Sequence, residues 1–278
     1  MDTPTHAPTH APTSTGAGRL RRPWTNKVPE IIAVFWVIKI MCTTIGETGA
    51  DNLMEHTSFT LVSTLWLSVA VLAVTLAVQF AQRRYVPAVY WSVLVVISVV
   101  GTLITDYFTD VRGVSLWIST GVFTVALCGV FAIWWSREGT LSIKTIVSPT
   151  REAFYWLAVL VTFALGTAAG DLLAGQADLG YLLSAGLFGT AIAVTYVAWR
   201  FLGLNEVAAF WIAYVLTRPM GASVGDYLSQ PTQNGGLGLG TTTTSLIFLG
   251  AIVALVAYLS ISRRDQLARP TSVVEPAV

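Results

Sequence analysis

Four aspartates recur at the same place in a repeated sequence pattern, and carboxylates placed in this way could bind cations or carry protons. Each follows an aromatic residue, a Trp, nine residues, a Gly and four further residues. Successive aspartates are 55, 65 and 55 positions apart, so the pattern occurs four times. Oxygen ligands suit protons, Na⁺, Mg²⁺, Ca²⁺ or Mn²⁺. The four sets are Trp36, Gly46, Asp51; Trp91, Gly101, Asp106; Trp156, Gly166, Asp171; and Trp211, Gly221, Asp226.

The positions one helical turn before these aspartates are also rich in oxygen, and they share a helix face with them. Three of the four carry an oxygen, at Glu47, Thr102 and Thr167. A carboxylate in hydrocarbon is costly unless it is paired, solvated or neutralised, so four of them favour a common purpose. The alternative is that the aspartates orient the outer helix ends and face water. We predict an ion-binding site of Asp51, Asp106, Asp171, Asp226, Glu47, Thr102 and Thr167, with the five carboxylates as metal ligands.

Two basic residues lie inside predicted membrane spans. Because an unpaired buried cation is expensive, Lys39 and Arg218 should each pair with an acid, either Glu47 or a repeated aspartate. We interpret them as countercharges, which either hold the assembly together or compete with a transported cation. Pro219 should bend its helix and free a backbone carbonyl. His56 could add an imidazole ligand, or could be a solvated loop residue.

The composition indicates a membrane protein. The 278 residues are 54 % hydrophobic and only 11 % charged, outside the usual range of soluble domains. Runs of about 20 apolar residues are long enough to cross a bilayer as helices, so we expect lipid to surround most of the chain. The eight predicted spans are residues 29–51, 58–82, 87–109, 113–136, 152–174, 180–202, 206–228 and 241–262.

Basic residues predict the orientation of the spans, because cytoplasmic loops retain Lys and Arg. Of the 16 basic residues, 13 precede the first span or follow an even-numbered span, all on one side. Only Arg112 lies in a loop on the opposite side. Both termini should therefore be cytoplasmic. The Trp residues of the repeat should lie near the inner interface as an aromatic belt.

The repeat predicts an all-α membrane protein of eight transmembrane helices, built as four tandem helix-pair repeats in two halves of four. Parallel repeats imply a pseudo-symmetry axis along the membrane normal, with the odd-numbered helices around it. The repeated glycines should let these helices pack closely. The domain prediction is a disordered Pro/Thr/Ala-rich tail at 1–26, helical halves at 27–140 and 141–265, and a disordered tail at 266–278.

Several classes of function lack support in the sequence. A formal net charge of +1 gives no reason to expect a nucleic-acid partner. Cys42 and Cys128 form no CxxC pair, so neither a disulfide framework nor a thiolate metal cage is indicated. There is no nucleophile–base set, so we expect no enzyme and no cofactor other than a transported cation. The sequence does not specify the oligomeric state.

The stretch KVPEIIAVFWVIKIMCTTIGETGADNL, residues 27 to 53, resembles a bacterial family described as uncharacterised membrane-anchored, multi-pass integral membrane proteins. The later stretches GDLLAG and RPMGASVGDYL extend the resemblance over most of residues 27 to 262. The resemblance implies a multi-pass protein of the bacterial plasma (inner) membrane. It implies no activity, substrate or catalytic residue.

These observations favour a secondary transporter for a small hard cation, with a divalent metal such as Mn²⁺ as the best candidate. A partly buried carboxylate exchanges a cation for a proton readily, so proton coupling fits the same residues. The alternative is a non-transporting membrane scaffold or sensor in which the repeated aspartates are structural.

Overall fold

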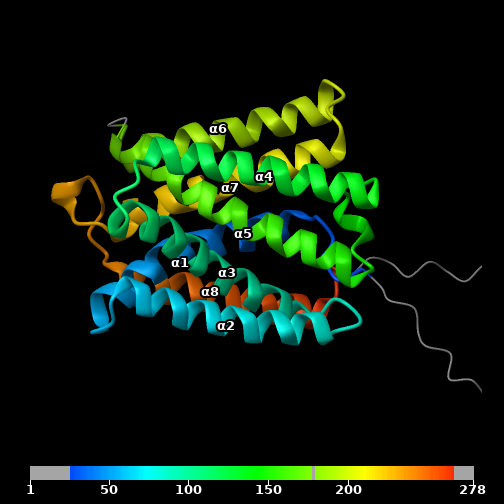
Figure 1. The fold of residues 1–278 in the computed structure, drawn as a ribbon, viewed down its shortest axis with the longest axis horizontal. Coiled ribbons are helices and arrows are strands. Elements are labelled where there is room, and N and C mark those ends of the chain that lie inside the picture. The colour runs from blue at the N-terminus through cyan, green and yellow to red at the C-terminus, as the bar shows by residue number, and fades with distance from the viewer. Residues whose placement is uncertain (1–25, 177–178, 266–278) are drawn as a thin grey trace, which may run out of the picture.

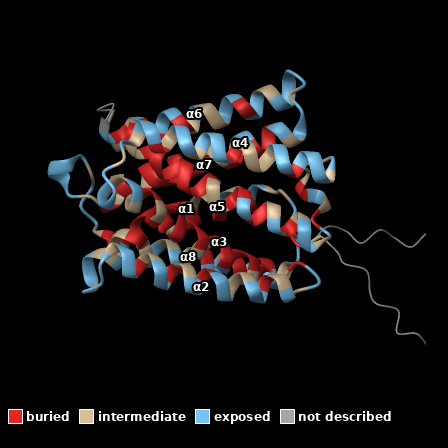
Figure 2. Cartoon of the chain, viewed as in Figure 1, coloured by how far each residue is buried: buried red, intermediate tan, exposed pale blue. Residues whose placement is uncertain are grey.

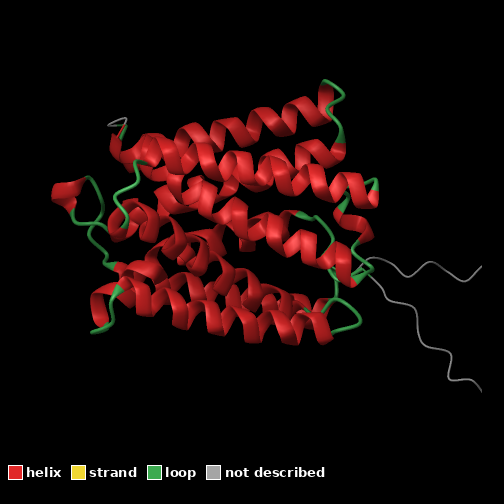
Figure 3. Cartoon of the chain, in the orientation of Figure 1, coloured by secondary structure: helices red, strands yellow, loops and turns green. Residues whose placement is uncertain are grey.

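Long helices follow one another through residues 26–176 and 179–265, which are the residues that this computed structural model describes (Figures 1 and 3). The predicted tails lie outside the described residues, except for Asn26. The helices are α1 (Ala33–His56), α2 (Leu61–Ala81), α3 (Pro87–Asp106), α4 (Leu116–Glu138), α5 (Pro149–Asp171), α6 (Gly180–Phe201), α7 (Glu206–Ser229) and α8 (Thr241–Ser262). Short turns are the π-helices η1 (Tyr107–Val111) and η3 (Leu172–Gln176) and the 3₁₀ turns η2 (Ile143–Thr145) and η4 (Thr232–Asn234).

The helical prediction is confirmed in the described residues. Seven of the eight helices are long and apolar enough to cross a membrane, as expected of a multi-pass membrane protein. The exception is α1, which carries Lys39, Glu47 and Asp51. Lys39 and Glu47 are buried inside the bundle, so these charges do not oppose a membrane setting for α1.

The first helix is displaced from its predicted span of residues 29–51. Residues 27–32 are not helical, because backbone groups there bond elsewhere: Lys27 N–H donates to Ile146 O at 3.2 Å, and Glu30 N–H donates to Asp265 O at 2.9 Å. The helix then continues to His56, beyond the repeated aspartate. A hydropathy pattern contains neither of these tertiary contacts.

The eight helices form an inner set and an outer set (Figure 2). In α3, α5 and α7 more than half of the most apolar stretch is buried, against less than a fifth in α2, α4, α6 and α8. The outer helices expose large apolar side chains, including Trp66, Trp117 and Leu246. Such an outward apolar surface is suited to lipid, whereas the polar residues are gathered inside.

The inner helices close into a ring: α1 packs against α3, α3 against α5, α5 against α7, and α7 against α1. The outer helices pack in the same rotational order, α2 on α3, α4 on α5, α6 on α7 and α8 on α1. The two helices of one repeat, such as α1 and α2, make few contacts with each other. Each outer helix therefore packs on the inner helix of the next repeat, and α8 closes the circle.

The repeated glycines make this ring possible, because a Cβ on any of them would lie closer than 3.0 Å to a side chain of the next inner helix. The contacted residue always lies eight positions before the repeated aspartate of its own helix. At Gly46, Gly101 and Gly221 a backbone atom of the neighbouring helix also lies within 3.1 Å, so the neighbour has little room to move there. The contacts are Gly46 to Ser98, Gly101 to Phe163, Gly166 to Arg218, and Gly221 to Thr43.

Replacing Gly101 should test whether the ring depends on this spacing. A Cβ there would meet the Phe163 Cβ at 2.5 Å and backbone atoms at 3.1 and 3.2 Å, so Gly101→Ala should destabilise the protein by about 1–3 kcal/mol through overpacking. The measurement is thermal and denaturant unfolding in detergent micelles. Gly121→Ala on α4 is the control, because nothing lies within 4 Å of that position. Equal stability of the two variants would contradict the close-packing argument.

The end of the bundle that carries the loops 82–86, 139–148 and 202–205, here called the basic end, is closed by aromatic residues. The Trp residues of the repeat pack inward: Trp91, Trp156 and Trp211 are buried and so face the bundle and not its outer surface, while their depth near the inner interface stays a prediction. Each of the four Trp residues packs on the Phe or Tyr that stands directly before the Trp of the preceding repeat, and these contacts follow the order of the ring. The ring-centroid distances are Phe35–Trp91 5.6 Å, Tyr90–Trp156 5.4 Å, Tyr155–Trp211 6.2 Å and Phe210–Trp36 5.8 Å.

Buried polar contacts hold Lys27 and Asp265, near the two ends of the described chain, to the basic end. Lys27 forms an ion pair with Glu152 at 2.6 Å, both side chains being 1 % exposed, and also donates to Phe80 O. Gln79 donates to the second oxygen of Glu152 at 3.0 Å. On the other side, Tyr85 donates to Asp265 Oδ2 at 2.6 Å. Lys27 therefore precedes the first helix, as predicted, and is also a buried countercharge to Glu152.

Asp265 should make stability depend on pH. Burial raises the pKa of its carboxyl, partly offset by the Tyr85 hydrogen bond. An acid with a raised folded-state pKa stabilises the fold fully below its ordinary pKa of about 4, and this contribution is lost as pH rises through the folded pKa. Asp265→Asn should therefore flatten the fall in unfolding temperature from pH 4 towards neutral. The exposed Asp110→Asn control should keep the wild-type slope; equal slopes in both variants would refute this role.

Candidate functional site

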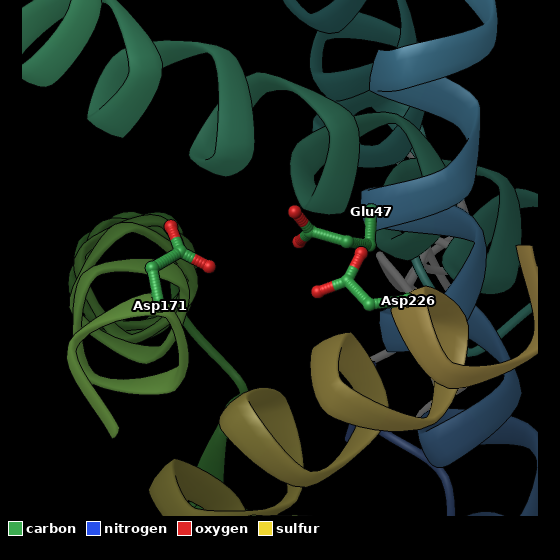
Figure 4. A group of neighbouring side chains, drawn as sticks. All are labelled: Glu47, Asp171 and Asp226. Carbon is green, nitrogen blue, oxygen red and sulfur yellow. The ribbon is translucent and has the colours of Figure 1, made fainter. Parts of the chain in front are cut away.

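Three carboxylates converge at the acidic end of the bundle, which carries the loops 57–60, 112–115 and 230–240. Glu47 of α1, Asp171 of α5 and Asp226 of α7 each offer an oxygen, and these oxygens lie within 4.8 Å of one another (Figure 4). Glu47 is 6 % exposed and Asp226 is 8 % exposed, whereas Asp171 is partly exposed. Among the described residues, no hydrogen bond or ion pair reaches the Asp226 carboxylate. The group therefore combines close, largely buried acids with limited solvent access.

Arg218 lies beside this group and connects all four inner helices. Its side chain is fully buried, and it forms an ion pair with Glu47 Oε2 at 3.0 Å. It also donates to Thr43 O at 3.2 Å, to Thr167 Oγ1 at 2.8 Å and to Thr102 Oγ1. The prediction that Arg218 pairs with an acid is confirmed. A buried guanidinium with several donors needs such a set of acceptors, and here each repeat supplies part of it.

The repeat pattern explains how these groups meet. Glu47, Thr102 and Thr167 occupy the position four residues before the repeated aspartate in the first three repeats. Arg218 occupies the position eight residues before it in the fourth repeat, about 6 Å lower along a helix. Its long side chain reaches up from that lower layer into the layer of the other three helices. The fourth repeat therefore differs from the others, and its single guanidinium bonds to polar groups of the other three repeats.

Lys39 has different partners from those predicted. Among the described residues it pairs with no carboxylate; its Nζ donates to Tyr214 O at 3.0 Å and to Thr217 Oγ1 at 2.5 Å. The same nitrogen lies 3.8 Å from the centroid of the Tyr214 ring. The prediction of an acid partner is wrong, because Lys39 lies eight residues before Glu47, roughly 12 Å lower along α1.

Pro219 lies in a stretch of α7 whose backbone carbonyls accept hydrogen bonds from α1. Lys39 binds Tyr214 O, Thr43 Oγ1 donates to Thr217 O at 3.3 Å, and Thr44 Oγ1 donates to Gly221 O at 3.1 Å. Because a proline has no N–H, Pro219 leaves Val215 O without its usual helical donor, and the three carbonyls above lie two or five residues from Pro219 in the same stretch. The α1–α7 contact is thus held by polar groups where both helices carry a cation.

The remaining predicted site residues lie outside the carboxylate group. Asp51 and Asp106 are partly exposed and do not join the three acids within the described residues. His56 lies in the last turn of α1, exposed, with its Nδ1 near Asn52 O at 3.2 Å. Asp106 and Asp171 each end an α-helix that continues as a π-helix, η1 or η3. These π turns, which often occur at functional sites, have no simple signal in the sequence.

Sequence reasoning omitted two residues that contact the Arg218 guanidinium. Thr43 supplies a backbone carbonyl, and the ring of Phe163 lies 5.7 Å from the guanidinium carbon. Both occupy the Arg218 position of their own repeats, eight residues before the aspartate. Helical spacing already places both on the helix face of the predicted site, but an apolar ring and a backbone carbonyl give no sequence signal of contact with a guanidinium.

The Arg218–Glu47 pair should be energetically coupled. Arg218→Met leaves a buried carboxylate without its cation and should cost about 3–5 kcal/mol of stability. Adding Glu47→Gln should recover part of that loss, because the uncompensated charge is removed. The measurement is a double-mutant cycle from unfolding in micelles. Strictly additive losses would show that the two side chains do not stabilise each other.

Comparison with protein families gives one result. The family described as Repeat of Unknown Function (DUF347) matches the chain four times, at residues 34–85, 89–140, 154–203 and 209–265. Each match covers one inner helix and the outer helix that follows it, so the fourfold repeat is confirmed. Searches of curated proteins and of solved structures gave no match.

Proposed function

The chain belongs to the family described as Repeat of Unknown Function (DUF347), and because that description assigns no activity, we propose from the site that the protein is a secondary transporter of a small hard cation. The best candidate is a divalent metal such as Mn²⁺. The observation that supports this most is the meeting of Glu47, Asp171 and Asp226 from three separate inner helices. Placement in a bacterial inner membrane with both termini cytoplasmic is part of the proposal.

Charge favours a divalent ion in this group. Three ionised carboxylates beside one guanidinium leave a net charge of −2. Two unit charges about 5 Å apart at an effective dielectric constant of 20 repel by roughly 3 kcal/mol, so a bound cation or protons relieve a substantial cost. Carboxylate ligands suit Mg²⁺, Ca²⁺ and Mn²⁺; Mg²⁺ gives up water reluctantly, and Ca²⁺ takes six to eight ligands. A compact three-carboxylate site therefore fits Mn²⁺ best.

Arg218 gives the site a built-in competitor. Its guanidinium shares Glu47 with any bound cation, so binding weakens the ion pair and release restores it. The guanidinium keeps its charge at physiological pH, and it lies on the side of the group that faces the basic end. A fixed cation in this place opposes leakage of cations along the axis, as in other selective pathways. The site would then load and unload by a conformational change of the inner helices.

Protons are the natural coupling ions, because the same carboxylates can hold either two protons or one divalent cation at equal charge. Asp171, Asp51 and Asp106 are partly exposed, so water and ions can reach the site from the acidic end. The buried aromatic residues close the basic end in this conformation. The described arrangement therefore corresponds, in the proposal, to a state loaded from the acidic end.

Mn²⁺ binding and uptake test the proposal directly. Purified protein should bind Mn²⁺ by calorimetry and carry it into proteoliposomes, and Asp226→Asn should weaken both by at least tenfold, because it removes a carboxylate that has no other partner among the residues that the structure describes. Asp110→Asn is the matched control: it makes the same change at an exposed acid of the acidic end and should leave both unchanged.

The same experiment separates the transporter from a scaffold or sensor. If wild-type protein neither binds nor carries Mn²⁺, Mg²⁺, Ca²⁺ or Na⁺, the three acids are structural and the transporter proposal is refuted. If Asp226→Asn and Asp110→Asn behave alike, any transport does not use this group. Unfolding temperatures of both variants identify a loss that follows from misfolding alone.

A further inference from the structure

The four outer helices share an equivalent position near the basic end, and α6 fills it differently from the other three. In each helix this position lies 15 residues after a buried Ser or Thr. The pairs are Thr64 and Gln79, Ser119 and Trp134, Ser184 and Trp199, and Thr244 and Leu259. Gln79, Trp134 and Leu259 are 1 % exposed, whereas Trp199 is 40 % exposed. At this position the side chain of α6 therefore does not pack into the bundle as its three counterparts do.

The equivalent contact of α4 shows what α6 lacks. Trp134 of α4 packs on the repeated Trp211 of α7, with ring centroids 5.8 Å apart. Rotated by one repeat, Trp199 of α6 would pack on the repeated Trp36 of α1. The ring of Trp199 packs instead on the exposed Tyr196 of its own helix, at 5.8 Å. Trp36 is consequently the least buried of the four repeated Trp residues.

A cavity of about 620 Å³ lies where this contact is missing, a volume typical of small-molecule sites. It is lined by Trp36, Trp199, residues 31–33, residues 141–144 and the beginning of α7. Its lining on α6 extends from Gly189 to Trp199, roughly 15 Å along the helix. This length is about half of the ~30 Å hydrocarbon core of a bilayer. The cavity therefore has the depth of one membrane leaflet.

The end of the cavity at the basic end carries one positive and one negative charge. Lys144 Nζ and Glu206 Oε1 are 2.6 Å apart, and these side chains are 57 % and 60 % exposed. Such an exposed pair contributes little to stability, so both groups can change partner at small cost. A zwitterionic phospholipid offers both partners, its phosphate to Lys144 and its ammonium to Glu206. An anionic head group without an amine leaves Glu206 beside a phosphate of like charge.

The head group must determine which lipid is selected. Apolar side chains are no more oily than lipid tails, so an acyl chain gains little by leaving the bilayer for an apolar groove. The charged pair distinguishes phospholipids by the pattern of their charges. A primary ammonium has three N–H donors for a carboxylate, as a lysine has, whereas a quaternary amine has none. These groups together favour phosphatidylethanolamine.

We propose that this cavity binds one phosphatidylethanolamine molecule of the leaflet at the basic end, with an acyl chain along α6 and the head group on Lys144 and Glu206. The lipid takes the place of the side chains that pack at the equivalent position of α4. It also covers Trp36, whose ring packs on Phe210 at 5.8 Å in the aromatic layer that closes the basic end. The proposal does not depend on cation transport.

Lipid binding to the purified full-length protein tests the proposal. Native mass spectrometry from detergent micelles gives the dissociation constants of phosphatidylethanolamine and phosphatidylglycerol with identical acyl chains. Wild-type protein should bind phosphatidylethanolamine at least tenfold more tightly. Ala193→Phe should weaken this binding at least tenfold, because Ala193 lines the cavity and a ring there occupies its space. Ala132→Phe, the same change at an exposed position of α4, should leave the affinity unchanged.

A second variant tests the head group separately and serves if Ala193→Phe folds poorly. Glu206→Gln removes the partner of the ammonium and should reduce the preference for phosphatidylethanolamine over phosphatidylglycerol at least fivefold. Glu138→Gln is its control, because it breaks another ion pair of the basic end, with Arg151, and should keep the wild-type preference.

Three results would overturn the proposal. The first is wild-type protein that binds both lipids equally or binds neither. The second is a folded Ala193→Phe variant that binds phosphatidylethanolamine as tightly as Ala132→Phe does. The third is a dimer in micelles that Ala193→Phe dissociates while no phosphatidylethanolamine is bound, which assigns the cavity to a second copy of the chain.

Discussion

The buried charge of Arg218 is the constraint on which the centre of the molecule depends. A guanidinium without solvent must find acceptors, and the carboxylate, hydroxyls and carbonyl that accept from it come from α1, α3 and α5, while the arginine itself comes from α7. These contacts fix the axial height of the four helices relative to one another. Asp171 and Asp226, one turn higher on their own helices, then meet Glu47. A different residue at this position would leave their placement without its central support.

Close packing and polar pairing act at the same height in this protein. Each repeated glycine admits the side chain that lies eight residues before the aspartate of the next repeat, and one of these side chains is Arg218 itself. Gly166 thus provides the space through which the arginine reaches the axis. In a membrane, where apolar side chains gain little by leaving lipid, small residues and hydrogen bonds are the main means of holding helices together. Here both means converge on one residue.

The sequence predicted the parts of the fold that depend on period and composition. Apolar runs located the helices, and the Trp–Gly–Asp spacing identified four units and the residues that face the centre. It did not predict which helices pack together, because the outer helix of each unit packs on the next unit, and no local pattern records that choice. For the same reason α1 was placed too early: the contacts that keep residues 27–32 out of the helix come from Ile146 and Asp265, which are far away in sequence.

Only part of the site could be predicted from the sequence, and the reason is physical. Helical spacing correctly placed Glu47, Thr102 and Thr167 in one layer, and charge arguments gave Arg218 an acid partner. The four aspartates occupy the same position of the repeat, so the sequence pattern could not distinguish Asp171 and Asp226 from Asp51 and Asp106. Lys39 contacts one backbone carbonyl, one hydroxyl and an aromatic face in place of an acid, because acceptors of that kind become available only when two helices pack.

The packing of every outer helix on the following repeat means that no single repeat can complete its own structure. A lone two-helix unit would present an inner helix without a cover and an outer helix without a support, so four units must associate at once or remain unfolded. Because the four units are joined in one chain, they need not be identical, and only the fourth carries Arg218 and Pro219 at these repeat positions. In such a closed circle the chain break is arbitrary, and it lies where α8 meets α1 and Glu30 binds Asp265.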